Sequence, residues 1–168
     1  ETKAVKVTKK GVYFAFRDQG ACISIMAVKV YYIVCPEVVI NFANFSATPT
    51  ARELTQIEHA TGKCVDNAEV VDGAPTYLCK GDGKWYLPSG GCKCKAGFEA
   101  DIEAQTCIIC PPGKYKYGVG DDKCQPCPAH SKAPDQGMSE CRCNTGYYRS
   151  SKDPKSMPCT QPPTAPQS

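Results

Sequence analysis

Apolar and polar residues alternate most clearly in the first 34 residues. Residues 12–16 are rich in aromatic and β-branched side chains, and residues 18–20 have the composition of a turn. In the strand predicted from 21 to about 34, alternate positions share a face, so one face takes Cys22, Ser24, Met26 and Val28. Two strands do not form a stable sheet alone. We therefore expect residues 1–34 to be the last strands of a larger β-sandwich that begins upstream of this chain.

The rest of the chain shows weaker alternation and is divided by cysteines. Residues 35–93 hold four cysteines and a polar loop over 47–62, in which 51–54 predict a helical turn. Residues 94–159 form a cysteine repeat, and the Pro-rich residues 160–168 are typical of a linker. We expect a mainly β protein of small disulfide-rich modules.

The cysteine repeat has a regular period. Its four intervals are 13, 14, 14 and 16 residues long, and several restart with Gly and an aromatic residue after the cysteine. Such a ladder with few aliphatic residues favours an elongated rod of stapled loops. Eight cysteines allow 105 pairings. Nearest-neighbour closure follows the period and predicts the pairs Cys94–Cys107, Cys110–Cys124, Cys127–Cys141 and Cys143–Cys159.

Cysteine content indicates the compartment. The chain has 13 cysteines in 168 residues, a density typical of oxidised extracellular proteins. Asn44-Phe45-Ser46 is an acceptor site for N-glycosylation, which agrees with secretion. The net charge of +3 comes without a basic run for nucleic acid or anionic lipid, and the longest apolar run is too short to span a membrane. The odd cysteine count and the absence of a signal peptide suggest a piece of a longer protein.

Metal binding and catalysis are the alternative roles for these cysteines and for the histidines and carboxylates of the chain. The pairs Cys107/Cys110 and Cys124/Cys127 have the spacing of a four-thiolate zinc site, but nine other cysteines would then need another explanation. A redox Cys-x-x-Cys is disfavoured because neither pair lies between a strand and a helix. His59 and His130 lie in polar segments without a nucleophile pattern, and Asp121-Asp122 lacks the spaced ligands of a calcium loop. We expect no catalytic residue, no metal and no cofactor.

The run 79–85, followed by Cys92, resembles the closing half of a sushi module. It contains a glycine turn, the only tryptophan of the chain (Trp85), and a final cysteine. The resemblance implies first-to-third and second-to-fourth pairing, which gives Cys35–Cys79 and Cys64–Cys92. Each crosslink should stabilise the fold by about 3–4 kcal/mol in the chain-entropy model.

Taken in order, the motifs resemble the extracellular region of Eph receptors, the receptor tyrosine kinases that bind ephrins. The matching segments cover nearly the whole chain and are residues 11–22, 28–32, 35–36, 62–65, 83–85, 91–99, 110–113, 127–128, 153–160 and 162–163. The loop 41–62 departs from the family pattern and leaves the branch of the family open. The resemblance implies the last strands of the ephrin-binding jelly roll (1–34), a sushi-like module (35–93), an EGF-like or TNF-receptor-like repeat (94–159) and a linker into a fibronectin type III domain (160–168).

The resemblance also implies roles for individual residues. It implies that Cys22, Ser24 and Met26 lie on the strand next to the ephrin channel, with core packing as the alternative for Met26, and that Cys22 pairs with a cysteine upstream of residue 1. The cysteine-rich region supports side-by-side clustering with other copies of the receptor, with Ile108, Ile109, Tyr115 and Tyr117 as candidate contacts; these side chains could equally only cover disulfides. The kinase of the family is cytoplasmic and lies outside this sequence.

Two other functions stay open at this point. One is a sushi and EGF-type adhesion or complement-regulatory protein, which would lack the strand remnant and the Pro-rich exit. The other is a secreted enzyme or inhibitor with cysteine-rich ancillary modules. The expectation is the extracellular portion of a single-pass plasma-membrane receptor that binds ephrins and other receptor copies, and neither nucleic acid nor the membrane itself.

Overall fold

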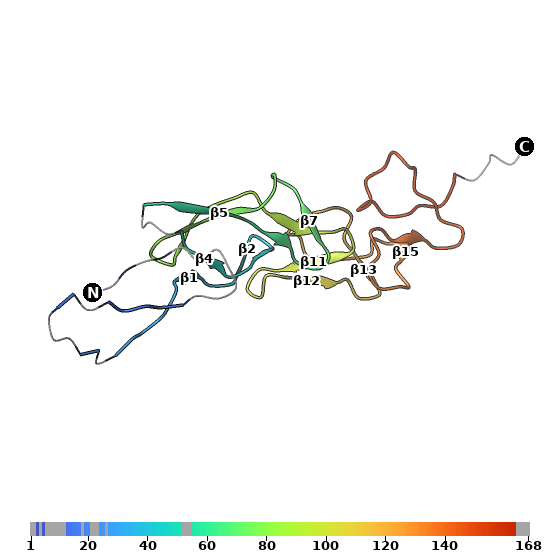
Figure 1. Ribbon diagram of the computed structural model, residues 1–168. Coiled ribbons are helices and arrows are strands. Elements are labelled where there is room, and N and C mark those ends of the chain that lie inside the picture. The colour runs from blue at the N-terminus through green and yellow to red at the C-terminus, as the bar shows by residue number, and fades with distance from the viewer. Residues whose placement is uncertain are drawn as a thin grey trace, which may run out of the picture.

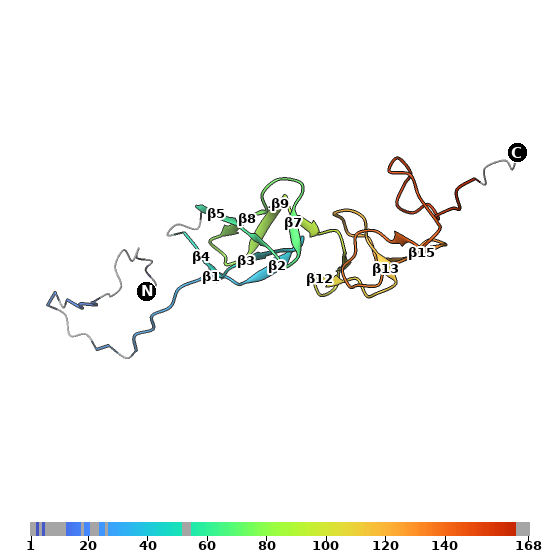
Figure 2. The same ribbon diagram turned by 90° about the vertical axis from the view of Figure 1, so that its right-hand side faces the viewer.

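The computed structural model describes residues 3, 5, 13–17, 19–20, 24–25, 27–51 and 55–163, and these residues contain strands and no helix. The molecule is elongated, and small sheets follow one another along its length (Figures 1 and 2). The strands are short: β1 (Val34–Cys35), β2 (Val38–Ile40), β3 (Ala43–Phe45), β4 (Thr48–Pro49), β5 (Ile57–Thr61), β6 (Lys63–Cys64), β7 (Ala68–Val70), β8 (Thr76–Lys80), β9 (Trp85–Ser89), β10 (Cys92–Cys94), β11 (Phe98–Asp101), β12 (Thr106–Ile109), β13 (Lys114–Tyr115), β14 (Gln125–Pro126), β15 (Ser131–Lys132) and β16 (Arg142–Cys143). The predicted class, small disulfide-rich β modules, is confirmed.

The first unit consists of two three-stranded antiparallel sheets, β2-β3-β6 and β5-β8-β9. Aromatic side chains from both sheets meet in its core: the buried Phe45 ring lies 5.3 Å from Tyr77 and 5.9 Å from Trp85, and Tyr77 stacks on Trp85 at 5.0 Å. The Trp85 Nε1–H donates a 2.7 Å hydrogen bond to the carbonyl of Pro36. The only tryptophan is thus the core residue that the sushi resemblance implied.

Strand β10 joins the first unit to the second. It pairs with β7, and its two cysteines are buried on the same face because they are two residues apart. Cys92 is bonded to Cys64 of the first unit, whereas Cys94 is bonded to Cys107 of the second. The same apolar core includes Phe42 and Ala100, so it is continuous across the joint.

The second unit contains three antiparallel two-stranded ladders, β11-β12, β13-β14 and β15-β16, and in the first unit β1 pairs with β4. The first core includes Ala100 of β11, and a second small core is formed by Tyr115, Ala133 and Cys141. Such small cores depend on crosslinks. Among the described residues there are six disulfides, and they are the six pairs that the repeat period and the sushi resemblance predicted: Cys35–Cys79, Cys64–Cys92, Cys94–Cys107, Cys110–Cys124, Cys127–Cys141 and Cys143–Cys159.

The two strands predicted within residues 1–34 are not found in the described part of that segment, where strand structure begins only at Val34. The described residues 13–17 and 27–32 are exposed. A strand needs a hydrogen-bonded neighbour, and the sheets of the first unit already pair among themselves. The assignment of residues 1–34 to a jelly roll stays a prediction. The helical turn predicted over 51–54 falls mostly on residues outside the described ranges.

Candidate interaction surfaces

The solvent side of the sheet β5-β8-β9 carries apolar groups. Cys79 is fully buried, and Trp85, which pairs with it across the β8-β9 ladder, points to the core. Strand alternation therefore places four residues on the opposite side of the sheet: Leu78, Tyr86, His59 and Ile57. These four residues are the outer sheet face. Both views place β5 at the rim of the molecule (Figures 1 and 2). Antiparallel sheets commonly leave one face in water, but here that face is not purely polar.

The pairing of β9 with β8 is irregular at the end of this face. The β8-β9 register shifts between Thr76 and Leu78, and Leu87 opposite has a positive φ of 50°. Such a bulge re-aims a side chain, and Leu87 is 72% exposed. Sequence reasoning missed this residue, although an apolar side chain directly before Pro88 in a turn-rich segment was a usable signal. Leu87 is thus an exposed apolar side chain that directly follows Tyr86 of the outer sheet face along β9.

Charged groups fix the side chain of Tyr86 on the outer sheet face. Its hydroxyl donates a hydrogen bond to the Asp82 carboxylate, and the Lys80 ammonium lies 4.2 Å from its ring centroid. The bond from Tyr86 lowers the pKa of Asp82, and the same bond raises the pKa of Tyr86. The ring therefore has a defined orientation on the surface.

Ile108 and Ile109, two predicted clustering contacts, are both exposed but do not form one patch. In the β11-β12 ladder Ile108 pairs with Glu99 and Ile109 with Phe98, so their side chains point to opposite sides. Ile109 packs toward the backbone of Gly137, where an added Cβ would lie 3.1 Å from its Cδ1. Only one of the two can face a given partner.

Tyr115 and Tyr117 also differ in exposure. Tyr115 is 6% exposed and belongs to the second core, so the expectation that it is a surface contact is wrong. The Tyr115 ring packs with Ala133 and Cys141 at the end of β13, whereas Tyr117 lies beyond the strand. Tyr117 is 62% exposed and remains a candidate contact for clustering.

The predicted ephrin-proximal residues lie in the first 34 residues. Ser24 is exposed and outside any strand. Cys22 and Met26 lie outside the described residues. Their role stays a prediction.

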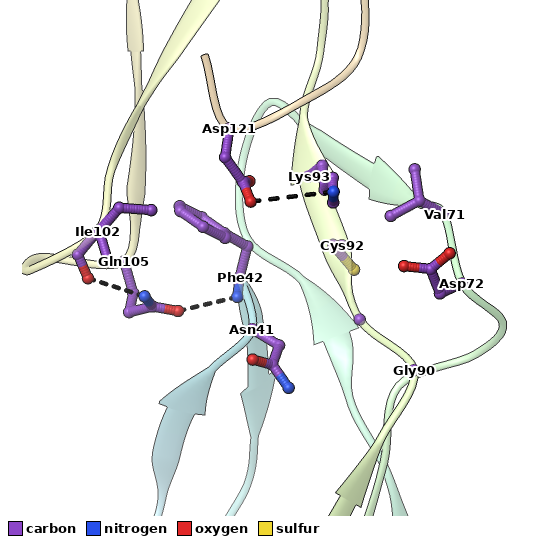
Figure 3. Close-up of a pocket in the computed structure, with 11 residues that line it drawn as sticks. Asn41, Phe42, Val71, Asp72, Gly90, Cys92, Lys93, Ile102, Gln105 and Asp121 are labelled. Carbon is purple, nitrogen blue, oxygen red and sulfur yellow. Dashed lines mark hydrogen bonds and ion pairs between the residues drawn. The ribbon is translucent and has the colours of Figure 1, made fainter. Parts of the chain in front are cut away.

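A hollow of about 360 Å³ lies at the joint between the first and second units (Figure 3). Phe42 and Gln105 line it from the β2-β3 and β11-β12 hairpins, and Val71 and Asp72 lie across from them. The Lys93 ammonium and the Asp121 carboxylate meet at 4.0 Å on its rim. This ion pair contributes little by itself because both side chains are over 40% exposed.

Backbone conformation and hydrogen bonds hold the two units in contact at this joint. Asn41 and Phe42 both have positive φ, 51° and 55°, as the two-residue turn between β2 and β3 requires. The Phe42 N–H donates to Gln105 Oε1 at 2.9 Å, and Gln105 Nε2–H donates to the Ile102 carbonyl at 2.8 Å. Sequence reasoning missed this contact, because the hydrogen-bonded residues are 63 positions apart.

The zinc alternative is wrong. Cys110 and Cys124 are bonded to each other, Cys107 is bonded to Cys94 and Cys127 to Cys141, so none of the four is a free thiolate. Within the described ranges, no three His, Cys, Asp or Glu side chains are grouped as metal ligands. The His130 ring stacks on Tyr147 with centroids 4.1 Å apart.

Asn44 of the glycosylation sequon lies in the middle of β3. Its neighbours Ala43 and Phe45 are buried, so Asn44 points to the solvent side of the sheet β2-β3-β6. Its Nδ2–H donates to Glu37 Oε1 at 3.0 Å. Because Phe45 packs against Tyr77 and Trp85 of the other sheet, Asn44 and the outer sheet face lie on opposite sides of the first unit.

Three family models match consecutive parts of the chain. Residues 1–35 match the ephrin receptor ligand binding domain, residues 36–94 the ephrin cysteine rich domain, and residues 97–141 the model described as tyrosine-protein kinase ephrin type A/B receptor-like. The second and third matches meet at the joint carried by β10.

Curated relatives match nearly the whole chain. Ephrin type-B receptor 2 of Gallus gallus is 44% identical over 161 residues, ephrin type-A receptor 5 of Gallus gallus 43% over 162, and ephrin type-A receptor 4-B of Xenopus laevis 45% over 161. Each alignment covers 96% of this chain and 16% of the relative. No helix in the described part is long and apolar enough to cross a membrane.

Proposed function

We propose that this chain, which belongs to the Eph receptor family, works in a cell-surface receptor for membrane-attached ephrins. It is an extracellular segment with the end of the ligand-binding domain and the cysteine-rich region. The observation that carries this proposal is the order of the matches: a ligand-binding segment is followed directly by two cysteine-rich units. A sushi and EGF-type adhesion or complement protein would not carry the first of these segments. The kinase activity belongs to the parent receptor, and this segment contributes recognition.

The cysteine-rich region is proposed to hold neighbouring receptors together after ephrin binds. Its crosslinks and the shared core at the joint make it stiff, so little conformational freedom is lost when two copies meet. The outer sheet face and Leu87 supply an apolar contact, and Ile57 and Leu87 are 42% and 72% exposed. Exposed apolar groups that gather on one side are typical of protein interfaces.

A cell-surface experiment tests this surface. The double variant Ile57→Arg/Leu87→Arg, in the complete receptor, places two cations on the proposed contact. We expect ephrin-induced clustering, measured by fluorescence brightness analysis, and receptor tyrosine phosphorylation to fall severalfold, since burial of unpaired charge opposes association. Ephrin binding to the same cells should be retained.

The matched control is Val39→Arg. Val39 is 37% exposed and pairs with Asn44, so it lies on the opposite side of the same unit. Clustering should be unchanged in this control. The outer sheet face would be discarded if the double variant clustered as the unmodified receptor does. Tyr117→Asp and Ile108→Asp, tested in parallel, then decide whether the second unit supplies the contact instead.

Asn44 is proposed to carry an N-linked glycan. Its position on the solvent side of β3 leaves the side chain accessible, and the glycan would cover the side of the first unit that lies away from the outer sheet face. Enzymatic deglycosylation of secreted protein should lower its mass, and Asn44→Gln should abolish that shift. An equal shift in the variant would contradict the assignment.

A further inference from the structure

The chain enters the first unit through residues 33–36, the entry segment, where the ligand-binding match ends and the cysteine-rich match begins. Its strand β1 pairs with β4, and the Thr50 N–H donates a 3.0 Å hydrogen bond to the Ile33 carbonyl, one residue before that ladder. At the other end, the Pro36 carbonyl accepts the 2.7 Å hydrogen bond from the Trp85 Nε1–H. Both ends of the entry segment are thus hydrogen-bonded to the first unit.

The backbone of the entry segment has little freedom to rotate. Cys35 is fully buried and is bonded to Cys79 of β8, so the middle of the segment is covalently tied to the sheet. Pro36 has a fixed φ, and the residue directly before a proline is confined to extended conformations. A hinge needs residues whose φ and ψ can change. The four described residues of the entry segment offer no such position.

The β8-β9 turn, residues 81–84, lies against the entry segment. Its Gly83 has a positive φ of 78°, and the Gly83 N–H donates to the Lys80 carbonyl at 3.0 Å. A Cβ added at Gly83 would lie 2.8 Å from Cγ2 of Ile33 and 3.2 Å from the carbonyl oxygen of Val34. Glycine is therefore needed here for two reasons: the turn requires a left-handed residue, and the entry segment is too close for a side chain.

The β8-β9 turn is itself held by hydrogen bonds to the sheet. The Asp82 carboxylate accepts a 3.0 Å hydrogen bond from the Lys84 N–H and a second one from the Tyr86 hydroxyl. A movement of the turn away from Ile33 would strain these bonds. The surface that contacts the entry segment is therefore part of the sheet β5-β8-β9 and not a free loop.

We propose that the entry segment and the β8-β9 turn form a rigid connection, in which Gly83 is the positioning residue that seats Ile33 and Val34. The rigid connection sets one angle between the ligand-binding segment and the cysteine-rich units, so a rotation of one is passed to the other. It lies within one receptor, and it therefore holds or fails independently of the proposed clustering surface.

Hydrogen exchange of the Thr50 amide, measured in the complete receptor ectodomain, reports on the position of Ile33. Gly83→Ala places a Cβ against the entry segment, and exchange at Thr50 should become about tenfold faster. The matched control is Gly73→Ala. Gly73 also has a positive φ, of 87°, but an added Cβ there meets no atom within 4 Å. The control carries similar backbone strain without the contact, so Thr50 should stay protected.

A combined variant separates the contact from the strain at Gly83. Ile33→Ala removes the Cγ2 atom that an added Cβ would meet. In Ile33→Ala/Gly83→Ala, exchange at Thr50 should therefore be slower than in Gly83→Ala alone, as expected for two residues in contact. Ile33→Ala alone tests the same contact without backbone strain if Gly83→Ala is not secreted, and it should also speed exchange at Thr50.

A distance measurement tests the angle itself. Lys29 of the ligand-binding segment and Asp66 of the first unit are both exposed, so each position can carry a genetically encoded spin label that leaves the cysteines paired. Double electron–electron resonance should give one narrow distance distribution in the unmodified ectodomain and in Gly73→Ala. In Gly83→Ala the distribution should become about twofold broader, because the seated residues gain freedom to rotate.

Three results would overturn the proposal. The first is equal exchange at Thr50 in Gly83→Ala and Gly73→Ala, which would assign the effect to backbone strain. The second is a combined variant that exchanges at Thr50 as fast as Gly83→Ala, which would show that Ile33 is not seated on the turn. The third needs no substitution at the contact: a broad distance distribution in the unmodified ectodomain would make the entry segment a hinge.

Discussion

The backbone N–H of Phe42 donates a 2.9 Å hydrogen bond to Oε1 of Gln105 and so ties the tip of one hairpin to the turn of another. Phe42 is 4% exposed, and its partner lies in the second unit. This bond and the continuous core hold the two units in a fixed arrangement.

Gln105→Ala should lower the free energy of unfolding by about 1–3 kcal/mol, because it leaves the buried Phe42 N–H without an acceptor. Gln105→Glu keeps an acceptor oxygen and should lose less. Denaturant unfolding followed through Trp85 measures both. Equal stability of Gln105→Ala and the unmodified chain would show that water replaces the lost acceptor.

Gly62→Ala should destabilise the first unit. A Cβ at this position would lie 2.8 Å from Cζ of Phe45, the ring that contacts Tyr77 and Trp85. Overpacking of this kind costs about 1–3 kcal/mol, and the shifted ring should change Trp85 fluorescence and the near-ultraviolet circular dichroism. Gly118→Ala is the control, since an added Cβ there meets no atom within 4 Å. If both variants unfold at the same denaturant concentration, Phe45 does not restrict this site.

Tyr115→Asp and Tyr117→Asp should behave differently although the residues are two positions apart. A carboxylate at Tyr115 would lie against Ala133 and Cys141, and burial of this charge should prevent folding of the second core or reduce secretion strongly. At the exposed Tyr117 the same change should leave the melting temperature nearly unchanged. Comparable yields and melting temperatures of both proteins would contradict the burial of Tyr115.

Glu140 should make the loop closed by Cys143–Cys159 sensitive to acid. The hydrogen bond from Lys155 lowers the pKa of Glu140 below its ordinary value of 4.5, and Arg149 and Arg142 act in the same direction. Because the pKa is lower in the folded state, the stabilisation is present above pH 4.5 and is lost as the pH falls through the folded value. The pair is largely exposed, so we expect less than about 1 kcal/mol.

The check is hydrogen exchange around Lys155 in the unmodified chain and in Glu140→Gln. The difference in protection between them should be present at neutral pH and should disappear in acid, where both side chains are uncharged. High salt should also reduce it, because exposed ion pairs are screened. A difference that does not depend on pH would assign the effect to packing of the side chain.

The sequence was sufficient for properties that depend on spacing along the chain. The six disulfide pairs agree with the repeat period and the sushi resemblance, and Trp85 lies in the core of the unit that its flanking motif implied. In the repeat each disulfide closes a loop of 13 to 16 residues, so a short range of sequence specifies it. Apolar spacing at residues 12–16 and 21–34, by contrast, predicted strands that the described residues before Val34 do not form, since pairing needs a neighbouring strand.

The sequence by itself therefore determined the family resemblance and the covalent framework of this protein. Only the tertiary structure decided which side chains are available to a partner. It buries Tyr115 and exposes Tyr117, turns Ile108 and Ile109 to opposite sides, and encloses the ammonium of Lys116 in backbone carbonyls. The physical reason is the separation of contacting residues along the sequence. Disulfide loops in the repeat close locally, whereas burial depends on contacts such as Phe42 with Gln105, which are distant in sequence and come together only in the folded chain.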